Sequence, residues 1–153
     1  VAIDLAIHDI DIFNYLFDGK ADTVFANMSS NLKNCEFEDH AEIMTKYDNE
    51  VLTILETNWL TPYKKRNLYI TGVDGIISVD YGNQTVTLYK ENNKVENVKV
   101  ENKEPLKEEL RSFVNAVQTN TEPEVSGQDG YDALKIVDAA MRSSKEKNLI
   151  YLD

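Results

Sequence analysis

The sequence predicts an α+β fold, an open and mainly antiparallel sheet with helices packed on one face. Three observations predict it: helical periodicity over 1–17, alternating periodicity with tight turns over 23–100, and helical periodicity again over 105–145. Strands joined by so few residues pair antiparallel, because a parallel crossover needs a longer connection. Strands and helices that are segregated along a chain are typical of this class. We expect residues 1–153 to form a single domain, since the chain is long enough for one well-packed core and short for two.

Apolar residues occupy most positions of residues 1–17. This pattern predicts a helix that is apolar around most of its circumference. Asp4, His8 and Asp11 are spaced four and then three residues apart, so they share one helical face. Burying such groups without partners is costly, so we expect this row to point into a cleft or to meet buried partners. Gly19 is the expected left-handed residue that ends the helix.

The alternating pattern of apolar and polar residues in the middle of the chain predicts strands that are joined in consecutive hairpins. The expected strands are 23–32, 40–47, 51–60, 67–71, 76–81, 84–89 and 95–100. Asp48-Asn49 and the glycines at 72 and 75 supply the turn residues. Ile54, Trp59 and Ile77 cannot all face the helices, so we expect a homo-oligomer through the open sheet face.

Helical periodicity returns at Pro105, which suits the first turn of a helix. Ser126 and Asp129 resemble a capping box that opens the last helix, which runs to about residue 145. Residues 149–152 are expected to return as an edge strand. The apolar face of the first of these helices comprises Leu106, Leu110, Phe113, Val114 and Val117, and the second is expected to bury Tyr131, Leu134, Val137 and Met141.

Composition excludes several classes of protein. The chain carries 16 Lys and Arg against 27 Asp and Glu, a net charge of −11, which disfavours nucleic-acid binding. The apolar runs are too short to span a membrane, and no signal peptide is visible, so we expect no membrane partner. Cys35 is the only cysteine, so no intrachain disulfide can form, which fits a cytoplasmic location.

Two motifs resemble those of a known family. Asp4-Leu-Ala-Ile-His8-Asp9-Ile-Asp11 resembles the active-site helix of the Gfo/Idh/MocA oxidoreductases. Residues 59–66, Trp-Leu-Thr-Pro-Tyr-Lys-Lys-Arg, together with Gly72–Gly75, resemble the branch acting on UDP-N-acetylglucosamine and related nucleotide sugars. The runs 122–134 and 139–143 are similar to the family as well, so the resemblance spans essentially the whole chain.

The resemblance implies an NAD(P)-dependent dehydrogenase that oxidises a sugar hydroxyl, most of all that of a UDP-N-acetyl-hexosamine. It implies that His8 accepts the hydroxyl proton, a task that imidazole performs near neutral pH, with Asp4 assisting. Asp11 is implied to bind substrate. Lys64 and Arg66 suit a pyrophosphate, and Trp59 and Tyr63 suit stacking on sugar or uracil. No metal ligand is implied.

The chain also departs from the family. Neither a Gly-x-Gly-x-x-Gly loop nor the Glu-Lys-Pro motif, whose lysine completes the catalytic trio, occurs in it. We therefore expect a fragment that lacks the N-terminal Rossmann domain, the part of the parent that mainly binds NAD or NADP. By this resemblance, residues 1–153 are the substrate-binding and oligomerisation domain alone, and such a fragment is expected to be inactive by itself.

Alternatives remain open for these residues. Asp4 and Asp9 also favour any helix N-terminus, His8 also suits a core, and Lys64 and Arg66 also suit a solvated hairpin end. A free sugar or an inositol is the alternative substrate. More remote alternatives are a metal-dependent hydrolase, with Asp4, His8 and Asp11 as ligands beside a distant one such as His40, and a non-enzymatic assembly module.

Overall fold

The computed structural model describes residues 1–32 and 36–153, so Cys35 lies outside the described residues. The chain divides into two compact units. The first unit is Val1–Thr61 with Glu122–Asp153, and the second unit is Pro62–Thr121. Each consists of antiparallel strands and helices, which confirms the α+β prediction.

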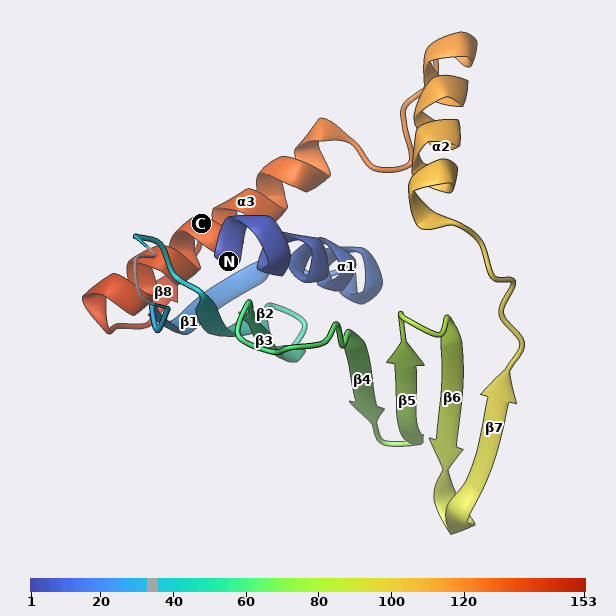
Figure 1. Ribbon diagram of the computed structural model, residues 1–153, viewed down its shortest axis with the longest axis horizontal. Helices are drawn as coiled ribbons and strands as arrows, with labels where there is room; N and C mark the ends of the chain where they lie inside the picture. The colour runs from blue at the N-terminus through green and yellow to red at the C-terminus, as the bar shows by residue number, and fades with distance from the viewer. Residues whose placement is uncertain (33–35) are drawn as a thin grey trace. The chain divides into compact units, whose positions relative to one another are not determined.

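The first unit contains a four-stranded antiparallel sheet in the order β3-β2-β1-β8 (Figure 1). Its strands are β1 (Ala21–Ser29), β2 (His40–Tyr47), β3 (Leu52–Asn58) and β8 (Ile150–Tyr151). β8 pairs with β1 through Thr23 and Val24, so the predicted return of the C-terminal segment to the sheet edge is confirmed. Beyond β8, the N–H groups of Ala26 and Met28 donate to the hydroxyls of Ser143 and Ser144, which satisfy the rest of that edge.

Three helical segments cover one face of this sheet: η1 (Ala2–Ala6, a π-helix), α1 (Ile7–Phe17) and α3 (Gly127–Glu146) (Figure 1). Inward side chains alternate along each strand, as expected for a half-covered sheet. Tyr47 is fully buried and its hydroxyl donates to Asn14 Oδ1 at 2.9 Å. Burial raises the pKa of Tyr47 to about 12. The core also includes Ile10, Phe13, Val24, Ala41, Ile43, Ile136 and Val137.

The buried face of α3 differs from the prediction. Val137 is buried as expected, but Tyr131, Leu134 and Met141 are exposed. The other residues of α3 that are buried are Ala133, Ile136, Ala139, Ala140 and Ser143. Alanines let the helix backbone approach β1 closely, so the larger side chains are turned outward.

The end of α1 also differs in one residue. Asp18, not Gly19, is the left-handed residue, with φ of 40°. Aspartate tolerates this conformation because its short polar side chain can bond locally. A Cβ at Gly19 would stand 2.7 Å from the Asn49 amide nitrogen, so a larger residue there would have to displace that side chain from its hydrogen bond to the Phe17 carbonyl.

The second unit contains a separate four-stranded antiparallel sheet in the order β4-β5-β6-β7. Its elements are β4 (Asn67–Gly72), β5 (Gly75–Asp80), β6 (Thr85–Lys90), the 3₁₀ turn η2 (Glu91–Asn93), β7 (Lys94–Val98) and α2 (Pro105–Thr119). The predicted hairpins are therefore present, although the strands form two ladders rather than one sheet. Gly75 has φ of +146°, which confirms the expected need for glycine in this turn.

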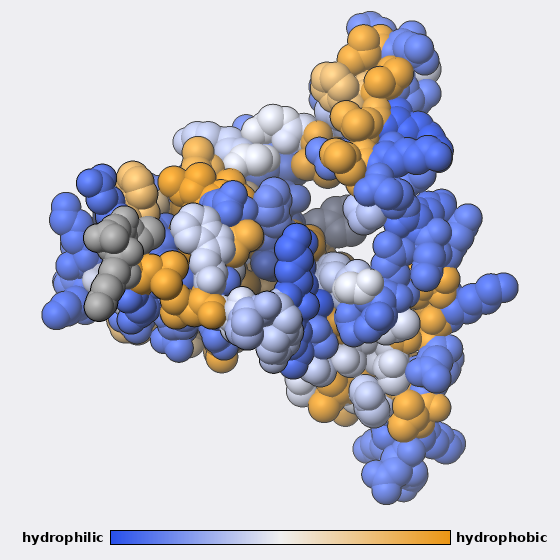
Figure 2. Space-filling model, in the orientation of Figure 1, coloured by the Kyte–Doolittle hydropathy of each residue, from blue (hydrophilic) through white to orange (hydrophobic). Residues whose placement is uncertain are grey.

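The α2 helix exposes its apolar face. Glu104 caps it by accepting from Lys107 N–H at 2.6 Å, and Pro105 occupies the predicted first turn. The predicted face is present, but its members are 50–67% exposed: Leu106, Leu110, Phe113, Val114 and Val117. Figure 2 shows these apolar residues gathered on the surface of the helix.

Asp39 holds Asn31 and Leu32, which follow β1, by hydrogen bonds. Its buried carboxylate accepts from the N–H groups of Asn31 at 2.8 Å and Leu32 at 2.6 Å, and from Asn31 Nδ2 at 3.1 Å. Burial by itself raises the pKa of Asp39, but these hydrogen bonds outweigh it and leave the pKa below its usual value.

Replacing Asp39 with asparagine is therefore expected to destabilise the fold in a pH-dependent way. A lowered folded-state pKa stabilises the protein above the usual carboxyl pKa of 3.8, and this stabilisation is lost as the pH falls through the folded-state pKa. Urea midpoints at pH 7 should be lower for Asp39→Asn than for the wild type, and the gap should narrow toward pH 3. The exposed Asp138→Asn is the control; a gap that stays constant with pH would contradict the argument.

Candidate active site

A π-helical turn precedes α1 at the site of the predicted polar row. The N–H of Ile7 donates to the carbonyl of Ala2, five residues earlier, before α-helical bonding takes over. Asp4 lies in the π turn and His8 in the first turn of α1. Because a turn takes roughly four residues in either geometry, Asp4 and His8 remain on one side of the helix. The sequence predicted an uninterrupted α-helix here; π turns are frequent at functional sites.

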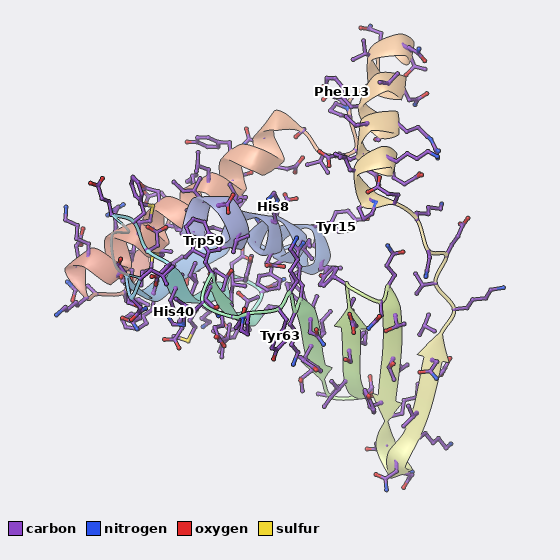
Figure 3. All side chains as sticks on the ribbon, in the orientation of Figure 1. His8, Tyr15, His40, Trp59, Tyr63 and Phe113 are labelled. Carbon is purple, nitrogen blue, oxygen red and sulfur yellow. The ribbon has the colours of Figure 1, made fainter. Side chains whose placement is uncertain are left out.

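The polar row is more open than the sequence predicted. Asp4 and His8 are exposed, and Asp11 is half-buried. The helix packs against the rest of the first unit through another stripe, Ala2, Ala6, Ile10 and Phe13. Of the row that was expected to point into a cleft or to meet buried partners, Asp11 lines a cavity, while Asp4 and His8 are exposed within this chain. His8 and Tyr15, both on α1, are labelled in Figure 3.

Asp11 faces a cavity of about 950 Å³ within the first unit. Burial, followed by the negative charge of Asp129, raises the pKa of Asp11, while His8 acts in the opposite direction. Asn14 and Tyr15 of α1 and Gln128, Asp129 and Asp132 of α3 also line the cavity. Its volume lies within the range of ligand pockets.

Asp129 belongs to the capping box that opens α3, which confirms the prediction for Ser126 and Asp129. Both the N–H and the hydroxyl of Ser126 donate to Asp129 Oδ2, each at 2.6 Å. These two bonds, the hydroxyl first, hold the pKa of Asp129 below its usual value. The sequence did not predict that Asp129 lines the same cavity as Asp11, because the capping signal says nothing about which helix lies opposite.

Trp59 follows β3 in the same unit as the polar row. Its indole is 46% exposed, and its backbone N–H donates to the Asp39 carbonyl at 2.9 Å. The first unit therefore contains Asp4, His8, Asp11 and Trp59 among the predicted site residues.

Tyr63, Lys64 and Arg66 belong to the second unit and are exposed. The guanidinium carbon of Arg66 lies 4.8 Å from the centre of the Tyr81 ring, a cation–π contact. In the same unit, Gln84 uses its side-chain amide to pair with the backbone N–H and carbonyl of Lys103. This pairing gives Gln84 a structural role ahead of α2.

The alternative of a metal-dependent hydrolase needs a set of metal ligands. Among the residues that the structure describes, no three His, Cys, Asp or Glu side chains are grouped so that they could hold an ion. Within the same residues, every helix is too short or too polar to cross a membrane.

Residues 1–152 match the model of the oxidoreductase family, C-terminal alpha/beta domain. The chain belongs to the Gfo/Idh/MocA oxidoreductase family. This membership confirms the family resemblance drawn from the motif at 4–11. The family assignment covers the polar row, both sheets and the helices.

Relatives agree in sequence and in fold. The myo-inositol 2-dehydrogenase of Thermotoga maritima is 23% identical over 164 residues, which cover all of this chain and 49% of the relative. The structure of UDP-N-acetylglucosamine 3-dehydrogenase from Acidithiobacillus ferrooxidans matches with a TM-score of 0.86 and 23% identity, over 95% of this chain and 47% of that one. The structure of an Agrobacterium radiobacter oxidoreductase in complex with NAD+, L-tartaric acid and magnesium matches with a TM-score of 0.79 and 18% identity. The match covers 97% of this chain and 48% of that one. At these identities the structural likeness establishes the fold, and this chain spans about half the length of these proteins.

Proposed function

We propose that this chain is the substrate-binding half of an NAD(P)-dependent dehydrogenase that oxidises a hydroxyl of a sugar, and of a UDP-N-acetyl-hexosamine in particular. The observation that carries the proposal is the exposed row of Asp4, His8 and Asp11 on η1 and α1, in a chain of the Gfo/Idh/MocA oxidoreductase family. The row joins an imidazole to two carboxylates, the groups that proton transfer from a hydroxyl requires.

In the proposed reaction His8 accepts the hydroxyl proton. Asp4, one turn earlier on the same side, orients the imidazole or binds a neighbouring hydroxyl. Asp11, half-buried at the cavity, accepts a hydrogen bond from another substrate hydroxyl. A lysine from the Glu-Lys-Pro motif of a preceding domain would act with His8.

The residues of this chain do not fit the nicotinamide cofactor itself. The chain has no Gly-x-Gly-x-x-Gly loop to hold the cofactor phosphates, and the cavity beside Asp11 is lined by an excess of carboxylates. NAD or NADP would be held mainly by an N-terminal Rossmann domain. This chain then contributes proton transfer and substrate binding only, and we expect the whole protein to work in the cytoplasm.

The nucleotide part of the substrate is assigned to the basic run in the second unit. Lys64 and Arg66 stand out in a chain of net charge −11 and suit a diphosphate. Trp59 and Tyr63 are exposed aromatic residues that suit stacking on sugar or uracil.

A free sugar or an inositol is the second candidate substrate. The observation that favours it is the lining of the cavity at Asp11, which includes Asp18, Asp48, Glu124 and Asp132 beside only two lysines, Lys20 and Lys135. Such a lining accepts hydroxyl groups and repels phosphate.

The test uses a protein that joins this chain to its nucleotide-binding domain, with NAD+ and NADP+ supplied separately. UDP-N-acetylglucosamine, N-acetylglucosamine and myo-inositol are the substrates, and reduced nicotinamide is followed by absorbance. We expect turnover with UDP-N-acetylglucosamine and none from this chain alone. Turnover only with myo-inositol or the free sugar would replace the nucleotide sugar by the second candidate; no turnover with any of them would refute the proposal.

We also propose that the open face of the first unit's sheet binds a second copy of this chain. Phe25, Met44 and Ile54 lie opposite one another on three neighbouring strands and are exposed on the face away from α1 and α3. Glu42 and Lys46 flank Met44 on the same face of β2. A two-fold axis through Met44 would bring Lys46 of one copy to Glu42 of the other, a self-complementary arrangement of charge.

Replacing Met44 with glutamate is expected to convert a dimer to a monomer, because it places two like charges at the centre of the interface. Sedimentation velocity of the wild type, Met44→Glu and the control Val73→Glu, which lies in a turn of the second unit, measures this directly. A wild type that sediments as a monomer, or a Met44→Glu variant that remains a dimer, would contradict the assignment of this face.

A further inference from the structure

Two side-chain amides, Asn14 of α1 and Gln128 of α3, line the cavity beside Asp11. Gln128 is exposed, and its amide nitrogen donates to Asp132 Oδ1 at 3.0 Å. Asn14 is half-buried and follows Asp11 by three residues on α1. Its amide oxygen accepts a hydrogen bond from the hydroxyl of Tyr47 at 2.9 Å. The oxygen of Asn14 is therefore already occupied by a group of the protein.

Tyr47 is a fixed donor to this oxygen. It is the last residue of β2 and is 1% exposed. Its ring meets the edge of the Phe17 ring with centres 6.3 Å apart, and its backbone N–H donates to the Val51 carbonyl at 2.9 Å. Burial raises the pKa of Tyr47, so its hydroxyl keeps its hydrogen throughout the neutral range.

The Tyr47 hydroxyl decides which way the Asn14 amide points. Within the described part of the chain, Asn14 Oδ1 is the acceptor of the hydroxyl hydrogen. If the amide were turned over, its nitrogen would face the phenol and the buried hydroxyl would lose this acceptor, which is costly. The nitrogen is therefore turned away from Tyr47. Its two N–H groups have no acceptor among the described residues.

A donor of this kind complements the rest of the cavity lining. The carboxylates of the lining can bind only substrate groups that donate, so a substrate oxygen that accepts needs an N–H or O–H group. Lys135 of the lining donates to the Asp153 carbonyl at 3.1 Å, and Lys20 is exposed. Asn14 offers half-buried N–H groups that no other described residue uses.

We propose that Asn14 binds the substrate by donating a hydrogen bond from its side-chain nitrogen to an oxygen of the sugar, and that Tyr47 is the positioning residue that orients it. The proposal rests on the proposed function, and it adds a neutral donor to the proton acceptor and carboxylates named there. The sugar oxygen belongs to a hydroxyl or to the carbonyl of an acetamido group, since both accept from an amide.

The experiment measures binding of N-acetylglucosamine and of myo-inositol to this chain by NMR. We expect saturable shifts of the Asn14 side-chain amide signals, and the ring signals of His8 report binding in the variants. Asn14→Asp keeps an acceptor for Tyr47 but removes the donor, so it should weaken binding by about 10-fold or more. Gln128→Glu makes the same change at the exposed amide and should leave binding unchanged.

The two sugars distinguish the two kinds of substrate oxygen. A loss in Asn14→Asp that is confined to N-acetylglucosamine would assign the acetamido carbonyl, which myo-inositol lacks. A loss with both sugars would assign a hydroxyl. If Asn14→Asp does not fold, the double variant Asn14→Leu with Tyr47→Phe replaces both hydrogen-bond partners by apolar groups and should show the same loss.

Tyr47→Phe tests the positioning role, because it removes the hydroxyl and retains the buried ring. We expect it to weaken binding by about 3–10-fold. Added to Asn14→Asp, the same change should have no further effect on binding, because no donor remains to be oriented. A merely structural role of Tyr47 would weaken binding equally with and without Asn14→Asp.

Asn14 amide signals that do not move with either sugar would overturn the proposal, as would unchanged binding in Asn14→Asp. Equal effects of Tyr47→Phe in the two backgrounds would overturn the role of Tyr47. The readout is binding and not turnover, so sugar binding at Asn14 in a protein without dehydrogenase activity would reject the proposed function alone. Turnover with a KM that Asn14→Asp leaves unchanged would reject this proposal alone.

Discussion

Replacing His8 with alanine is expected to lower kcat of the dehydrogenase that contains this chain by about 10²–10⁴-fold. His8 lies in the middle of the polar row, four residues after Asp4 and three before Asp11, and is the row's one group that suits a neutral-pH base. The alanine variant retains the cavity and the hydrophobic stripe of α1, so substrate binding should change less than turnover. Steady-state kinetics with saturating NAD+ measure both.

His40 provides the matched control for His8, because it is the second of the two histidines and opens β2 instead of lining the row. His40→Ala is expected to leave kcat within a few-fold of the wild type. His8 is exposed, so His8→Ala should leave the free energy of unfolding within about 0.5 kcal/mol of the wild type. Equal kcat values in His8→Ala and the wild type would show that His8 is not the proton acceptor.

Replacing Ile43 with alanine is expected to reduce the free energy of unfolding by about 2–5 kcal/mol. Ile43 is 2% exposed on β2, between β1 and β3, and faces the helices of the first unit. The alanine leaves a cavity that the close-packed core fills only partly. Ile43→Val, which removes one methylene, should cost about 0.5–1.5 kcal/mol. Urea denaturation followed by circular dichroism measures both variants.

Ile3 is the control for Ile43 because it is the same residue type at 57% exposure. Ile3→Ala should change the free energy of unfolding by about 0.5 kcal/mol or less in this chain. Similar losses in Ile3→Ala and Ile43→Ala would mean that β2 is not the centre of the core.

Local signals in the sequence were sufficient for most of the elements. The alternation over 40–47 and 52–58 requires no distant partner, and the hairpins depend on residues that are neighbours in the chain, such as Gly75 with its positive φ. The same is true of the Ser126–Asp129 capping box, whose two side chains and backbone groups lie within four residues. The family resemblance rests on linear motifs as well, and the family match over 1–152 bears it out.

Local sequence signals did not predict the features that depend on how helices and strands pack against one another. Periodicity favoured Tyr131, Leu134 and Met141 as the buried face of α3, but the core selected the alanine face. The apolar surroundings of Asp4 and His8 in the sequence predicted a cleft or buried partners, whereas both side chains are exposed within this chain. The division of the strands into two ladders likewise depends on where backbone pairing stops after β3.

For this protein, the sequence by itself determined the order and type of the elements, the turn and cap residues, and the family motif at 4–11. Only the tertiary structure decided which face of α3 is buried, how exposed His8 is, and that Asp129 and Asp11 line the same cavity. The reason is physical: propensity, capping and turn chemistry act over a few residues of chain. Burial and the pKa of Asp11 depend on side chains that are distant in sequence and adjacent only after packing.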